Sequence, residues 1–273
     1  MSAQALPDAQ AFAAKWLAAR PELAVALRFV EPRERAPRLA ADAIGREIEH
    51  AALRIRDTAV ATRKLEWWHA ELVAMADGQA RHPLTRVLGE SALARRVPTS
   101  AWAEAIAAAL SLREHAAAST LDGLLEAARR MHRPIAGLAG GIDAVSVIEA
   151  RALQSLFRDG LAIDDALAAG RLPVPLDLLA RHRLSRDDFA DAGGARTAAM
   201  GEHFAHLCAR MRDLDTARLP VLDAAALHAE RWRCRRAARA PGDAVRRTEG
   251  LPWSTAWAAW RASRMHAGAA STP

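Results

Sequence analysis

The sequence contains no tyrosine and few runs of β-branched residues, so it offers little of what β-strands are usually built from. Alanine is abundant instead, and 51% of the residues are hydrophobic, a composition that favours helix throughout. No apolar run reaches the ~20 residues that are needed to cross a bilayer. We therefore predict an all-α protein that is soluble or at most rests on a membrane surface.

Cysteine and lysine are also scarce. The two cysteines, Cys208 and Cys234, provide neither a metal-ligand spacing nor a disulfide framework, and the N-terminus lacks a signal-peptide pattern, so we predict a cytoplasmic protein. Lysine occurs only at Lys15 and Lys64, and arginine therefore supplies nearly all of the positive charge behind the net charge of +6. This surplus suits diphosphates, anionic membrane surfaces or nucleic acid. No nucleic-acid recognition motif accompanies it, so we predict no nucleic-acid partner.

The composition is uniform along the chain, and nothing marks a boundary between two regions. We therefore predict one domain that spans residues 1–273. Prolines divide it into helices: a first helix ends before Pro21, and residues 29–37 form a turn rich in Arg, Glu and Pro before a helix that begins near Arg38.

Residues 145–188 contain an acid on an apolar helix face. Asp159 continues the face that Ala152 and Leu156 form, and Ile163 follows on the same side. Burying a carboxylate costs several kcal/mol, an order of magnitude that only a cation or hydrogen bonds can offset. We expect the adjacent Arg158 to be the partner of Asp159. The pair Gly170-Arg171 follows, and Pro175 opens a short helix at Leu176.

Residues 63–88 form a second distinctive segment, with a helix that ends at Gly78 and another that starts at Pro83. The first of these helices carries the tandem Trp67 and Trp68, which we expect to pack in the core. A third segment, residues 43–57, reads AIGREIEHAALRIRD and places Arg46 and Glu49 one turn apart.

In order and wording, these segments resemble the squalene and phytoene synthase family. Its second acidic region has a helix ending in Arg-Asp, then Gly-Arg, Leu-Pro and DLLARHGLS, and residues 177–185 match the last part with Arg183 in place of glycine. The family's tandem-Trp segment is matched, in the same order, by Leu65, Trp67, Trp68, Glu71, Leu72, Gly78, His82 and Pro83. The resemblance covers nearly the whole chain.

The resemblance implies a single isoprenoid-synthase-like helical bundle around a central cavity. Active members of the family join two prenyl diphosphates head to head. They use two acid clusters on facing helices, Mg²⁺, and Arg residues that hold diphosphate. The small residues Gly137 and Gly140 stand where the family lets a prenyl chain approach the backbone; the alternative is that they follow a helix break after Pro134.

Both acid clusters depart from the family's pattern. The first has Glu49, His50 and Leu53 where three acids belong, and the alternative reading of Glu49 is a pair with Arg46 on a solvated helix face. In the second, the position four residues after Asp159 is an isoleucine. Asp164 and Asp165 are displaced by one and two residues, and only unwinding at Gly160 could turn Asp164 inward. Carboxylates one turn apart hold Mg²⁺ jointly, so each cluster lacks a partner.

Two hypotheses follow. The first is a non-catalytic relative with degenerate Asp-rich motifs that needs no cofactor and binds a prenyl or lipid ligand or a partner protein, as the family's assembly factors of respiratory complex I do. The second is an active, Mg²⁺-dependent prenyltransferase of isoprenoid biosynthesis. Its candidate residues facing metal and diphosphate are Arg46, Glu49, Arg158, Asp159, Asp164 and Arg171.

The C-terminal part adds two expectations. Residues 197–212 form a helix on which His203 and His206 lack a third metal ligand, so we expect surface histidines. Pro252 starts a last helix with Trp253, Trp257 and Trp260 on one side. We expect this side to dock on the bundle. The alternative is an interfacial helix that contacts a membrane peripherally, such as the inner membrane.

Overall fold

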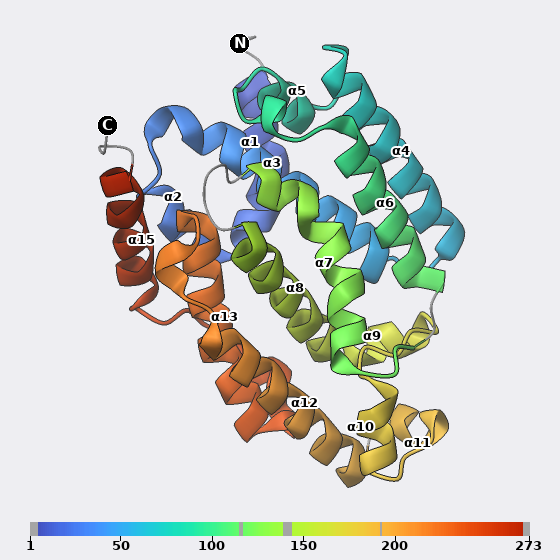
Figure 1. Ribbon diagram of the computed structural model, residues 1–273. Helices are drawn as coiled ribbons and strands as arrows, with labels where there is room; N and C mark the ends of the chain where they lie inside the picture. The colour runs from blue at the N-terminus through green and yellow to red at the C-terminus, as the bar shows by residue number, and fades with distance from the viewer. Residues whose placement is uncertain (1–4, 115–116, 139–143, 192, 270–273) are drawn as a thin grey trace.

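The computed structural model describes residues 5–114, 117–138, 144–191 and 193–269, and within these ranges every regular element is a helix (Figure 1). The all-α prediction is confirmed. The α-helices are α1 (Ala5–Ala19), α2 (Pro21–Leu27), α3 (Pro32–Leu53), α4 (Thr58–Ala76), α5 (Pro83–Gly89), α6 (Thr99–Glu114), α7 (Leu121–Leu138), α8 (Ala144–Leu161), α9 (Ile163–Ala168), α10 (Leu176–Arg181), α11 (Arg186–Ala190), α12 (Gly194–Asp213), α13 (Val221–Arg239), α14 (Ala244–Arg247) and α15 (Thr255–Ala269). The 3₁₀ turns are η1 (Ala94–Arg96), η2 (Thr216–Arg218) and η3 (Pro241–Asp243).

Local sequence signals fix most of these boundaries. Asp57 caps α4 by accepting the backbone N–H of Val60 at 3.1 Å, and Gly78 follows α4 with a φ of +73°, which glycine adopts without strain. Pro83 begins α5 as predicted. The predicted turn over residues 29–37 is wrong in its second half, because α3 already begins at Pro32 and continues through Pro37. A proline this near the start of a long helix removes one backbone hydrogen bond without ending the helix.

Helix α8 lies at the centre of the bundle, between α7 and α13 in Figure 1. Helices α12 and α13 pair with each other and also pack on α8, while α4, α5 and α6 gather around α3 on the other side. Helix α15 covers the outside of α13 and α2. Helices α3 and α8, the two segments that carry the expected acid clusters, thus both lie inside the bundle.

The apolar core forms one large group around α8, α12 and α13 and another around α3, α4 and α6, and α7 contributes to both. A smaller third group joins α2, α13 and α15. Trp68 is buried in the second group, but Trp67 is 47% exposed, so the expectation of a core position holds for one member of the pair. Within the described residues, no helix is long and apolar enough to span a membrane. That the chain forms a single domain stays a prediction.

The C-terminal helix departs from the prediction in two ways. It begins at Thr255 rather than at Pro252, so Trp253 precedes it. It also packs on the bundle through small residues, with Ala258, Ala259 and Ala262 buried, whereas the tryptophans are exposed. The expectation that the tryptophan side docks on the bundle is therefore wrong. The alanine side docks instead, because small side chains let the helix approach its neighbours closely.

Candidate functional site

Helices α3 and α8 meet inside the bundle through polar side chains. Ser155 on α8 donates a hydrogen bond from Oγ to Glu49 Oε1 on α3 at 2.9 Å, and Arg151 Nη1 on α8 lies 3.1 Å from Asp42 Oδ1 on α3. By contrast, α8 packs its backbone closely on α7, α12 and α13. The space between α3 and α8 is therefore filled by charged groups.

These groups form a continuous chain of alternating charge across four helices and the residue before α2. In order of contact, its members are Asp223, Arg151, Asp42, Arg46, Glu49, Arg158, Glu230, Arg233 and Glu22, with Arg20 paired to both Glu230 and Glu22. Five carboxylates thus face five guanidinium groups. Buried charges are tolerated only when they are paired in this way, and here each buried charge has a partner of opposite sign within the set.

Two acids of this set, Glu22 and Asp42, show how strongly neighbouring arginines lower the pKa of its carboxyl groups. Burial alone would raise the pKa of Glu22, but the guanidinium groups of Arg20 and Arg233 outweigh burial and lower that pKa to about 2. The pKa of Asp42 is likewise lowered, against its burial, by Arg46 and Arg151. Both carboxylates are therefore ionised at neutral pH and fully engaged with arginine.

Glu49 lies at the middle of the chain. It is largely buried, with Arg158 Nη1 at 3.7 Å and Arg46 Nη1 at 4.0 Å from its carboxylate oxygens. Burial would raise its pKa, but Arg158, the nearby His132 and Arg46 lower it to about 2. The predicted pair of Glu49 with Arg46 exists, but its predicted place on a solvated face is wrong, because this side of α3 is covered by α8.

Asp159 lies near the end of α8 and is 2% exposed. Arg171, in the segment after α9, donates two hydrogen bonds to the carboxylate of Asp159. Nη1 donates to Oδ2 at 2.7 Å and Nη2 donates to Oδ1 at 2.9 Å. Arg171 Nη2 also donates to the carbonyl oxygen of Leu53, the last residue of α3, at 2.7 Å. The expectation that Arg158 would pair with Asp159 is wrong, because consecutive helical residues point in different directions and Arg158 turns to Glu230.

The two acids that follow Asp159 lie elsewhere. Helix α8 ends at Leu161, and Ala162 has non-helical backbone angles, so the chain does change direction here. The change does not turn Asp164 inward: its side chain is 85% exposed and pairs with Arg196 at 2.5 Å. Asp165 is also exposed and pairs with Arg56. Of the candidate residues, the structure therefore groups Arg46, Glu49 and Arg158 in one place and Asp159 with Arg171 in another, and Asp164 joins neither.

These residues do not suit Mg²⁺. The positions one turn from Glu49 and from Asp159 are Leu53 and Ile163, both buried aliphatic side chains, and each oxygen of Asp159 accepts a hydrogen bond from Arg171. Across the described ranges, no group of three His, Cys, Asp or Glu side chains is arranged to hold a metal ion. A hard divalent cation needs several free oxygen ligands, which arginine has taken up here.

Gly137 and Gly140 are the two glycines that the resemblance places beside the central cavity. Helix α7 continues past Pro134 to Leu138, so the alternative of a helix break after Pro134 is wrong and Gly137 is helical. A Cβ at Gly137 would lie 3.1 Å from Val97 Cγ2, which shows close packing against the segment after η1. Gly140 lies outside the described residues.

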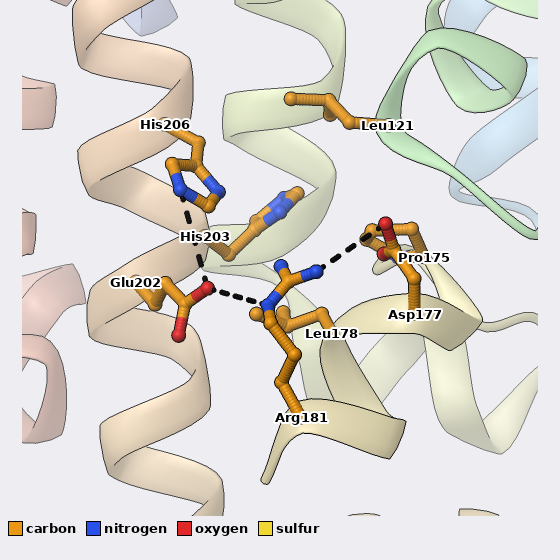
Figure 2. Close-up of a pocket in the computed structure, with 8 residues that line it drawn as sticks. All are labelled: Leu121, Pro175, Asp177, Leu178, Arg181, Glu202, His203 and His206. Carbon is orange, nitrogen blue, oxygen red and sulfur yellow. Dashed lines mark hydrogen bonds and ion pairs between the residues drawn. The ribbon is translucent and has the colours of Figure 1, made fainter.

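A separate pocket of about 430 Å³ opens between α10 and α12 (Figure 2). His203 is 1% exposed, and its Nε2 has no hydrogen-bond partner, so the expectation of a satisfied surface histidine is wrong for this residue. Burial lowers its pKa to about 4, which keeps it neutral at pH 7. His206, on the same helix, is exposed and lies 4.0 Å from Glu202, to which Arg181 also donates a hydrogen bond at 2.9 Å.

Several members of the buried chain were not anticipated from the sequence. Glu22, Asp42, Arg151, Asp223, Glu230 and Arg233 were all missed. The available signals were the spacing of Asp42 and Arg46 at i, i+4 and of Glu230 and Arg233 at i, i+3, which are equally common on solvated faces. Only tertiary packing distinguishes the two situations.

Comparison with known proteins places the fold. No protein-family model matches the sequence, and no curated protein matches it in a sequence search. A dehydrosqualene synthase, crystallised in complex with a ligand, matches the structure with a TM-score of 0.70 at 11% sequence identity, over 97% of this chain and 98% of that one. Squalene synthase HpnC from Alicyclobacillus acidocaldarius matches with a TM-score of 0.58 at 16% identity, over 100% of this chain and 98% of that one. The chain therefore has the all-helical fold of the squalene synthases.

Proposed function

We propose that this protein is a non-catalytic relative of the head-to-head prenyltransferases, which uses the bundle to bind a prenyl or other lipid ligand or a partner protein. The observation that carries the proposal is the pair Asp159–Arg171. The one acid of the second cluster that faces inward gives both of its oxygens to an arginine, so it is not available as a ligand for a metal ion. Degeneracy of the first cluster supports the same conclusion, because Glu49 stands alone among Ser155, Arg46 and Arg158.

The charge of the interior favours an anionic head group on such a ligand. Burial lowers the pKa of Arg158 to about 10, and the neighbouring Arg20 and Arg46 lower it further than Glu230 and Glu49 can restore. The pKa of Arg46, Arg151 and Arg233 is raised instead, so Arg158 is the guanidinium of this group whose charge its acidic neighbours compensate least. A diphosphate or a phosphate head group bound beside Arg158 would compensate that charge without any metal ion.

The alternative is an active Mg²⁺-dependent prenyltransferase. One observation favours it: Glu49 and Asp159 come from the two helices, α3 and α8, that would carry the acid clusters of an enzyme with this fold. In that case Mg²⁺ would have to displace Arg171 from Asp159 before the acid could act.

Incubation with farnesyl or geranylgeranyl diphosphate and Mg²⁺, followed by extraction of apolar products, distinguishes the two. We expect no head-to-head product. A product that disappears in Asp159→Asn, a variant of nearly the same shape that keeps hydrogen-bonding capacity, would contradict the proposal. A thermal-shift series tests the binding: farnesyl diphosphate should raise the melting temperature equally with Mg²⁺ and with a chelator. A rise that requires Mg²⁺ would favour the enzyme.

A further inference from the structure

The outward face of α15 carries large apolar side chains, whereas its inward face carries small ones. Ala259 and Ala262 are 0% and 1% exposed against the bundle. On the opposite side, Trp257 and Trp260 are 54% and 47% exposed, and Met265 follows two turns after Trp257 at 56%. The usual polarity of a surface helix is thus reversed, since its largest apolar groups face away from the core.

Trp253, immediately before α15, extends the same feature. Its side chain is 90% exposed, the highest value among the exposed large apolar residues of the described chain. Single exposed apolar residues are ordinary, but large apolar side chains gathered along one short segment mark a surface that something covers. Tryptophan is well suited to a binding surface that is apolar on one side and hydrated on the other, because its ring is apolar and its N–H is polar.

The charges on this segment have one sign. Arg261 and Arg264 are exposed on the same side of α15, and the guanidinium of Arg261 lies 5.6 Å from the ring centroid of Trp257. The last acidic residue of the chain is Glu249, so residues 250–273 contain no carboxylate side chain. A face that offers tryptophan and arginine without acids complements a surface that is apolar beneath and negative on top.

We propose that Trp253 and the outward face of α15 dock on the surface of an anionic phospholipid membrane, with α15 lying parallel to it. The tryptophan rings enter the boundary between head groups and acyl chains, and Arg261 and Arg264 contact lipid phosphates. This surface is built from residues other than the buried charge chain, so it stands whether or not the interior binds a prenyl or lipid ligand.

Vesicle sedimentation tests the proposal on the full chain. The probes are vesicles of phosphatidylcholine alone and of phosphatidylcholine with phosphatidylglycerol in equal parts, at low and high salt. We expect binding to the anionic vesicles, weakened by salt. The triple variant W253A/W257A/W260A should weaken this binding by at least tenfold. R261Q/R264Q should weaken it by about 30-fold at low salt and remove most of the salt dependence, since each arginine near an anionic surface is worth roughly fivefold.

The control is Trp67→Ala on α4, because Trp67 is 47% exposed, the same as Trp260, and lies on a different helix. It should bind vesicles like the parent protein. Brominated lipids should quench part of the tryptophan fluorescence of the parent and of Trp67→Ala, but not that of the triple variant. Absence of binding to anionic vesicles, or binding that the triple variant retains, would overturn the proposal. So would a dimer in solution that the triple variant dissociates, since a second copy would then cover this face.

Discussion

Arg171 holds Asp159 with two parallel hydrogen bonds of 2.7 and 2.9 Å while a third bond, from the same guanidinium, reaches the carbonyl oxygen of Leu53. The arginine thus joins the ends of α3 and α8, the two helices that would present acids to a metal ion in an enzyme of this fold. A fixed cation in this position pairs with the buried carboxylate of Asp159 inside the bundle, and this makes the pair a structural element that can be tested by itself.

Asp159→Ala should lower the free energy of unfolding by about 3–5 kcal/mol, because it leaves the buried guanidinium of Arg171 without its carboxylate. Denaturant unfolding measures the change. The control is Asp165→Ala, which removes an acid from an exposed pair with Arg56 a few residues away and should have no measurable effect. The double variant Asp159→Leu with Arg171→Leu should recover much of the lost stability. A loss no larger than that of the control would show that the pair does not hold α3 and α8 together.

The free energy of unfolding should decrease in two stages as the pH is lowered. His132 and His203 are buried and their pKa values are lowered to about 4, chiefly by burial, so the unfolded chain binds these protons first and stability is lost between pH 6.5 and 4. The carboxyls of Glu22 and Glu49 have pKa values of about 2, so the stability that they contribute above pH ~4.5 is lost as the pH falls toward 2.

The histidine stage can be isolated by mutation. His203→Gln should remove on the order of 3 kcal/mol of the loss between pH 7 and 4, since about 2.5 pKa units correspond to that free energy. Chemical denaturation at half-unit pH intervals measures it. His206→Gln removes an exposed histidine from the same pocket and serves as the control (Figure 2). An unchanged curve in His203→Gln would show that this imidazole is not held neutral by burial.

Cys208 should be a reactive thiol at mildly acidic pH. The neighbouring Cys234 and the positive charges of Arg235, Arg212 and Arg231 lower the pKa of the Cys208 thiol to about 6, against the effect of burial. Because the thiolate is the nucleophile, the rate of alkylation by iodoacetamide should be half-maximal near pH 6. Cys234 is buried in the core and should react only after unfolding.

The matched variants are Cys234→Ala and Cys208→Ala. Removing Cys234 takes away the largest cause of the lowered pKa of Cys208, so the midpoint of the rate profile should move to higher pH. Cys208→Ala should abolish alkylation of the folded protein. A midpoint near 8.5 in the parent, the ordinary value of a thiol, would show that Cys234 and the three arginines do not lower the pKa of Cys208.

The sequence predicted the helices better than the interior that they enclose. Boundaries at Gly78 and Pro83 depend on local backbone chemistry and were therefore accessible. The partner of Asp159 was not, because Arg171 reaches it only after the chain turns at Ala162 and returns past α9. The sequence did not predict the burial of Glu49 for another reason. Both faces of α3 are covered, one by apolar neighbours and the other by buried charged residues, and in a sequence such charged residues look the same as those of a solvated face.

Arg183→Gly should stabilise the protein, by about 0.5–1 kcal/mol. Among the described residues, Arg183 alone combines a side chain with a left-handed backbone, at a φ of 55°. It follows α10 in a Schellman arrangement in which the N–H of Leu184 donates to the carbonyl of Leu179 at 2.9 Å and that of Arg183 donates to the carbonyl of Ala180 at 3.1 Å. A left-handed conformation costs an ordinary L-residue on the order of 1 kcal/mol and costs glycine nothing, which outweighs the extra freedom of glycine in the unfolded chain. The exposed position of the arginine side chain means that little packing is lost.

Thermal and denaturant unfolding measure the gain in stability of Arg183→Gly. The control is Ala180→Gly in the same short helix, where a right-handed backbone gives glycine no advantage and stability should fall by about 1 kcal/mol. If Arg183→Gly were as destabilising as this control, the left-handed turn after α10 would not exist in solution.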